Sequence, residues 1–109
     1  MTAPLDTREI TAIYNGTAFI FPDTGTNATV LPAGMWFLVA SVVYSGGVAL
    51  TLNRAGSNDW PTIGALRGNT AQALTRVVSV EEKMKIGVNS DAHHDQKGAI
   101  LRLALIPLA

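Results

Sequence analysis

The stretch Gly34-Met-Trp-Phe-Leu-Val-Ala-Ser-Val-Val-Tyr44 decides the fold of this chain. It carries no charge and is rich in β-branched and aromatic residues, a composition that favours a strand over a helix. Glycine-containing turns bracket it, at 32–34 and 45–47. Side chains of a strand alternate between two faces. Here the odd-numbered face and the even-numbered face are both apolar.

Two apolar faces on one strand indicate that the chain assembles with other molecules. A small antiparallel protein with a single core normally leaves one face of a sheet polar. We therefore expect sister copies of the chain to cover the second face, and the alternative is that the long loop 54–69 covers it within one chain. The predicted interface residues are Trp36, Leu38, Val42 and Tyr44, together with Ile100 and Ile106 of the last apolar segment.

Composition supports assembly. A chain of 109 residues fits one domain with a limited stability margin. It has no cysteine, so neither disulfides nor thiolate metal sites reinforce it. Charged residues make up 15% of the chain, below the usual ~25%, whereas the hydrophobic content of 48% is ordinary. This combination indicates that part of the surface is not exposed to water.

Charge and hydropathy exclude several classes of partner. The formal net charge is zero and the eight basic residues are scattered, which argues against nucleic-acid binding. The first residues have neither a basic nor an apolar segment of the kind found in signal peptides. The longest apolar run is too short to span a bilayer. We expect synthesis in a host cytoplasm, with no nucleic-acid and no membrane partner.

Residues 1–9 are polar and aperiodic, and are predicted to form a flexible N-terminal arm before a single β-sandwich domain at 10–109. Asn15-Gly16 is the strongest hairpin signal. Turn spacing predicts an all-β, antiparallel jelly-roll sandwich of about eight strands, with other Greek-key sandwiches as alternatives. The expected strands cover 10–14, 17–21, 28–31, 35–44, 48–53, 72–80, 83–89 and 98–107.

Three features together resemble one family. A Pro-x-Gly turn at Pro32–Gly34 leads into the apolar strand, a second strand ends in a polar turn at Arg54, and an apolar strand, Gly98–Pro107, closes the chain. Over residues 28–107 this pattern resembles the trimeric C1q/tumour-necrosis-factor-like jelly roll. It is similar in particular to the small versions in bacteriophage virions, the capsid decoration (cement) proteins and fibre-head domains. The resemblance implies a homotrimer packed around a threefold axis by apolar strand residues.

The function that this resemblance implies is structural. The expected protein is a trimeric decoration protein on the capsid surface of the virion, with the major capsid protein as its partner, which stabilises the phage head. The arm would lie across coat subunits. The alternative is a receptor- or glycan-binding head of a tail fibre, with Trp60 as a binding platform unless it merely plugs the open end of the sandwich. The predicted partner-binding residues are Thr2, Pro4, Leu5, Arg8, Trp60 and Arg67.

Catalysis has little support in the sequence. No serine lies in a Gly-x-Ser-x-Gly elbow, and no phosphate-cradling motif is present. The segment Asp91–Asp95, with His93 and His94, is the only cluster of metal-capable side chains. We expect it to be a solvated loop, with ion binding across a symmetry axis as the alternative. We therefore expect no enzyme, cofactor or metal, and a cupin-type enzyme is the weakest alternative because cupins use several strand-borne histidines.

Overall fold

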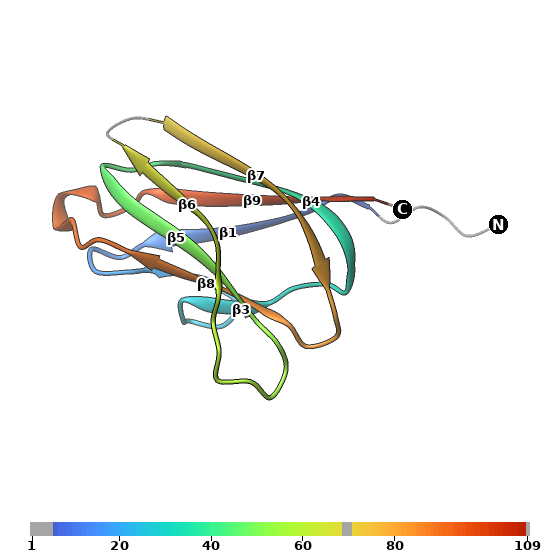
Figure 1. Ribbon diagram of the computed structural model, residues 1–109. Coiled ribbons are helices and arrows are strands. Elements are labelled where there is room, and N and C mark those ends of the chain that lie inside the picture. Colours follow the sequence, from blue (N-terminus) through green and yellow to red (C-terminus); the bar gives the residue numbers. More distant parts are fainter. Residues whose placement is uncertain (1–5, 69–70, 109) are drawn as a thin grey trace.

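Two antiparallel sheets pack face to face in the computed structural model, which describes residues 6–68 and 71–108 (Figure 1). Within these residues there are nine strands and one 3-10 turn, η1 (His94–Gln96), but no helix that is long and apolar enough to cross a membrane. The all-β, antiparallel jelly-roll prediction is confirmed. The first sheet has the order β2 (Phe19–Ile20), β1 (Arg8–Tyr14), β9 (Ile100–Pro107), β4 (Gly34–Val43), β7 (Ala71–Val80), and the second has the order β3 (Ala28–Val30), β8 (Lys85–Ser90), β5 (Gly46–Asn53), β6 (Thr62–Gly68).

The Asn15-Gly16 hairpin forms where the sequence predicts it, between β1 and β2. The Asn15 side-chain oxygen accepts hydrogen bonds from the backbone N–H groups of Thr17 and Ala18, each at 2.9 Å. Gly16 has a φ of 105°, in the region that favours glycine. The turn residues therefore close the hairpin by local chemistry alone.

Strand β6 corrects the prediction of an irregular loop across 54–69. Only the first part of that stretch, up to Pro61, is a loop, and Thr62–Gly68 pairs with β5. Gly64 interrupts the apolar pattern of β6 and hides the strand from sequence reasoning. A Cβ atom at Gly64 would lie 2.3 Å from a methyl carbon of Leu74, so this glycine permits β6 to approach β7 closely.

The core lies between the two sheets and contains the even-numbered face of β4. The largest side chains of the core are those of Trp36, Tyr14 and Tyr44. The leucines at 101, 103 and 105 of β9 belong to the same core and have no exposed surface. The Trp36 indole N–H donates a hydrogen bond of 2.9 Å to the Pro32 carbonyl. Because its apolar and polar requirements are both met inside one chain, this face needs no partner subunit.

Four of the six predicted interface residues are therefore assigned to the wrong face. The second sheet covers the even-numbered side of β4, which leaves these side chains only 1–4% exposed in a single subunit. Both faces of the stretch are apolar, and its sequence alone does not say which one turns inward. The residues concerned are Trp36, Leu38, Val42 and Tyr44.

The boundary of the N-terminal arm also moves. Arg8 and Glu9, predicted to belong to the arm, are the first residues of β1 and pair with Leu105 and Ala104 of β9. Backbone hydrogen bonding to β9 thus extends the strand beyond its apolar residues. Thr2, Pro4 and Leu5 lie outside the described residues, and their partner-binding role stays a prediction.

Replacing Trp36 by alanine should lower the free energy of unfolding by about 3–5 kcal/mol, because it leaves a large cavity in the core. Val30→Ala, at a side chain that is 51% exposed on β3, is the control and should change stability by about 0.5 kcal/mol or less. Chemical denaturation followed by circular dichroism measures both. Equal effects of the two substitutions would contradict the assignment of Trp36 to the core.

Candidate interaction surface

The odd-numbered face of β4 lies on the outside of the first sheet and is uncovered. Val43 is 68% exposed, Val77 on β7 is 60% exposed and Met35 is 47% exposed. Isolated exposed apolar residues are ordinary, but a continuous patch marks an interaction site. We call this surface the outer face of the first sheet. Its large apolar residues are Ile13, Met35, Phe37, Val39, Val43, Val77, Ile100 and Ile106.

Strand register organises this face into bands. Val77, Phe37 and Ile106 stand side by side across β7, β4 and β9 and form one apolar row. Nearer the other end of the sheet, Ile100 of β9 pairs with Ile13 of β1 to form a second apolar row. Between them, Ser41 and Thr11 flank Arg102 and make a polar row. The face therefore has a pattern that a partner must match.

The positive charge of Arg102 is paired with a negative charge on the same face. Its guanidinium lies 3.5 Å from the Glu9 carboxylate, and both side chains are more than half exposed. An exposed pair of this kind contributes little to the stability of the subunit. Its importance would rise on association, because a covered charge without a partner is costly. Because Arg102 and Glu9 pair with each other, a partner could cover the polar row without burying an unpaired charge.

The predicted interface residues on β9 lie on this face. Ile100 and Ile106 are each 40% exposed, and their role in an interface stays a prediction. Sequence reasoning missed their β4 and β7 neighbours on the same face. The register could have identified these neighbours, because Phe37 pairs with Ile106 and both must point the same way.

The predicted partner-binding residues do not converge on one surface. Arg8 belongs to the first sheet, whereas Trp60 and Arg67 lie on the outer side of the second sheet. Trp60 is 39% exposed, and a Cβ atom at Gly87 would be 3.0 Å from its ring. The indole thus lies over the middle of β8 and does not plug the open end of the sandwich.

The segment 91–95 is mostly exposed, as expected of a solvated loop, and only His93 is partly packed. The His93 ring meets Tyr44 edge-on, with ring centroids 5.7 Å apart, and its backbone N–H donates to the Tyr14 hydroxyl at 2.8 Å. Among residues 6–68 and 71–108, no group of three His, Cys, Asp or Glu side chains is placed to hold a metal ion. Ion binding across a symmetry axis stays a hypothesis.

A buried tyrosine pair anchors the start of this loop. The hydroxyls of Tyr44 and Tyr14 both donate to the Asp91 carbonyl, and their rings pack edge-on at 5.0 Å. Burial raises the pKa of the Tyr44 phenol, and the neighbouring Tyr14 hydroxyl raises it further. Tyr44 therefore stays protonated in the folded chain at a pH where an unfolded tyrosine ionises.

Comparison with known proteins identifies the fold. No family model matches the sequence, and no curated protein matches it. The globular domain of zebrafish complement 1qA aligns with a TM-score of 0.62 at 11% identity, over 96% of this chain and 98% of that one. Eiger TNF from S. frugiperda aligns with a TM-score of 0.57 at 6% identity, over 98% and 96%. Murine APRIL aligns with a TM-score of 0.52 at 10% identity, over 93% and 100%.

These similarities define the class of architecture. The chain has a C1q/TNF-like jelly-roll fold, as the sequence resemblance implied. At such low identity the likeness concerns the fold alone, because a single fold hosts many unrelated functions. Function must therefore be argued from this chain's own surfaces.

The raised pKa of Tyr44 predicts a loss of stability at alkaline pH. Unfolding releases the phenolic proton above about pH 10, the ordinary tyrosine value, so the free energy of unfolding falls as the pH rises beyond that point. Tyr44→Phe removes this proton and should make the decline shallower by up to ~1.4 kcal/mol per pH unit. Denaturant titrations between pH 8 and pH 11.5 measure the slopes, and equal slopes for wild type and Tyr44→Phe would refute the prediction.

Proposed function

We propose that this chain is a structural protein that forms a homotrimer through the outer face of the first sheet. We further propose that the trimer decorates and stabilises a bacteriophage capsid by binding the major capsid protein. The observation that supports assembly is the set of exposed apolar side chains that lie in two rows on β7, β4, β9 and β1. A chain without an intended partner for such a surface would be prone to aggregation.

Covering this surface would contribute a substantial favourable free energy to association. Full burial of a large apolar side chain yields roughly 1.5–3 kcal/mol. Six side chains at about half exposure would contribute on the order of 5–9 kcal/mol per subunit on the same scale. That gain is comparable to the whole stability of a small domain, about 5–15 kcal/mol. The six residues are Ile13, Met35, Val43, Val77, Ile100 and Ile106.

A trimer is the state that the C1q/TNF-like resemblance favours. In the trimer, the apolar rows of the outer face of the first sheet would pack around the threefold axis. The Arg102–Glu9 pair would fix how the subunits align with one another. The low charge content of the chain fits a subunit whose surface is partly buried in an assembly.

The capsid role is supported by what assembly leaves free. Once the first sheet is covered, the outer side of the second sheet, with Trp60 and Arg67, faces away from the sister subunits. This side and the N-terminal residues Thr2, Pro4 and Leu5 would supply contacts with a coat protein. The alternative function is a receptor- or glycan-binding head of a tail fibre, which would use the same free side.

Val77→Lys should dissociate the assembly, because it places a charge in the apolar row that Val77 forms with Phe37 and Ile106. Val30→Lys makes the same chemical change on the opposite sheet and should leave the oligomer intact. Native mass spectrometry at micromolar concentration should give three times the subunit mass of 11.5 kDa for wild type and Val30→Lys, and one subunit for Val77→Lys. A monomeric wild type, or an intact Val77→Lys trimer, would overturn the proposed interface.

The location of the protein on particles tests the second half of the proposal. Virus particles would be purified from lysates of the organism that carries this gene, and the protein sought by mass spectrometry and immunogold labelling. We expect label over the head surface. Label at fibre tips would support the alternative function, and absence from particles would overturn both virion roles.

A further inference from the structure

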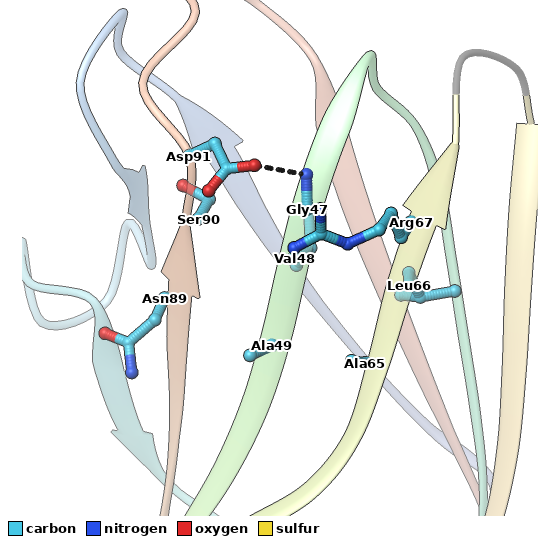
Figure 2. A pocket seen from close by; sticks show the side chains of 9 residues that line it. All are labelled: Gly47, Val48, Ala49, Ala65, Leu66, Arg67, Asn89, Ser90 and Asp91. Atoms are coloured by element: carbon cyan, nitrogen blue, oxygen red, sulfur yellow. Dashed lines mark hydrogen bonds between the residues drawn. The ribbon is translucent and has the colours of Figure 1, made fainter.

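The outer side of the second sheet carries two adjoining hollows that share Asn89. The first, of about 350 Å³, lies beside Trp60 and is also lined by Asn27, Thr51 and Gly87. The second, of about 210 Å³, continues from Asn89 toward Arg67 and Asp91 over β5 and β6 (Figure 2). We call the two together the Trp60–Arg67 groove. Its lining residues are Asn27, Ala28, Gly47–Ala49, Thr51, Trp60, Ala65–Arg67, Gly87 and Asn89–Asp91.

Small residues form the floor of this groove and keep it open. A Cβ atom at Gly47 would lie 3.2 Å from both the Arg67 guanidinium and the Asp91 carboxylate. A Cβ atom at Gly87 would lie 2.8 Å from the Thr51 hydroxyl and 3.0 Å from the Trp60 ring. Any larger residue at either position would displace the polar and aromatic groups that line the walls.

The loop that leads to Trp60 is held by a buried polar side chain. Asn53 is 6% exposed, and its amide nitrogen donates to the carbonyls of Ser57 at 2.8 Å and Asp59 at 2.9 Å. Both amide hydrogens are thus spent on the loop residues that immediately precede Trp60. The backbone next to Trp60 is therefore fixed before any ligand arrives, which lowers the entropy cost of binding.

At the polar end of the groove, Asp91 is held by hydrogen bonds, whereas the polar groups of Asn89 and Arg67 are available to bind a ligand. The Asp91 carboxylate accepts from the Gly47 N–H at 3.0 Å, and its own carbonyl is held by the two core tyrosines. Within the described residues, the side chains of Asn89 and Arg67 make no hydrogen bond or ion pair. Figure 2 shows Arg67 reaching across β5 toward Gly47. Donors and acceptors are thus available together.

We propose that the Trp60–Arg67 groove binds an uncharged oligosaccharide. A sugar ring presents a face of C–H bonds, which packs on the indole of Trp60, and hydroxyls that both donate and accept. The amide of Asn89, the carboxylate of Asp91 and the guanidinium of Arg67 match these hydroxyls. The single positive and single negative charge cancel, so the groove has no net attraction for a phosphate or a nucleic acid.

Strand pairing disfavours a peptide as the occupant. Extended peptides commonly bind by adding a strand to an exposed sheet edge. The middle of the groove lies over β8 and β5, which are each already paired on both sides, and the edge strands β3 and β6 line its two sides. The proposal uses the second sheet only, so it does not depend on the trimer. It rests on the alternative function, the glycan-binding head, in which a sugar takes the place of a coat protein on this side.

The two tryptophans provide the readout. Trp36 is buried and Trp60 is exposed, so a sugar stacked on Trp60 should change only the Trp60 part of the fluorescence. Wild-type protein would first be screened on a printed array of defined uncharged oligosaccharides. Soluble forms of the bound sugars would then be titrated by fluorescence and calorimetry. We expect saturable binding with a blue shift that is absent in Trp60→Phe.

Matched variants test the groove itself. Trp60→Ala should weaken binding by about tenfold or more, and Asn89→Ala and Arg67→Ala by smaller factors. Asn53→Asp, which removes both donors to the loop, should weaken binding with Trp60 still present. Val77→Lys should retain the wild-type affinity for the soluble sugar, which separates this result from the test of the trimer.

Three results would overturn the proposal. Wild-type protein that binds no sugar on the array would reject the ligand class. Unchanged affinity in folded Trp60→Ala and Asn89→Ala would place the sugar elsewhere. Capture of peptides from a random peptide array, with no sugar bound, would assign the groove to a different class of partner.

Discussion

The packing of one face of β4 against the second sheet is the constraint on which the rest of the structure depends. β4 lies between β9 and β7 in the first sheet, and its even-numbered side chains meet the second sheet in the core. Because strand side chains alternate, turning Trp36 inward forces Phe37 outward. The neighbouring strands follow the same parity through their register, so one choice of face sets the character of the entire outer surface.

Sequence alternation was enough to predict most of the strands but not this choice of face. In β9 the distinction is clear, because Leu101, Leu103 and Leu105 oppose Arg102, and their burial follows the pattern. In β4 both faces are apolar, and neither has a charged residue to indicate which face is exposed. The predicted interface joined Trp36 to Ile106, yet Ile106 pairs with Phe37 and must share its face. Only the pairing of strands distant in sequence resolves this conflict. Strand β6 escaped prediction for a related reason, since Gly64 serves a contact with β7 that local sequence does not reveal.

The groove was predictable only in part. Residue type singled out Trp60 and Arg67, but the residues that complete the site come from β5 and β8. Their proximity depends on the strand order of the second sheet, in which β8 and β5 are neighbours between β3 and β6. The role of Asn53 was equally hidden, because its two hydrogen bonds to the loop depend on a conformation that composition does not specify.

The outer face of the first sheet is largely apolar, whereas the outer side of the second sheet carries a polar groove, so the two sides of the molecule suit different partners. An apolar surface favours contact with copies of itself, and a polar groove over small residues does not. If copies pack through the first sheet, every groove points away from the symmetry axis and is repeated on the periphery. Identical sites on one rigid body can engage a repetitive ligand at a high effective concentration, so modest affinity at each site is enough for firm attachment. Assembly and recognition would then use separate sheets of one small domain, and a substitution on either sheet would leave the other function intact.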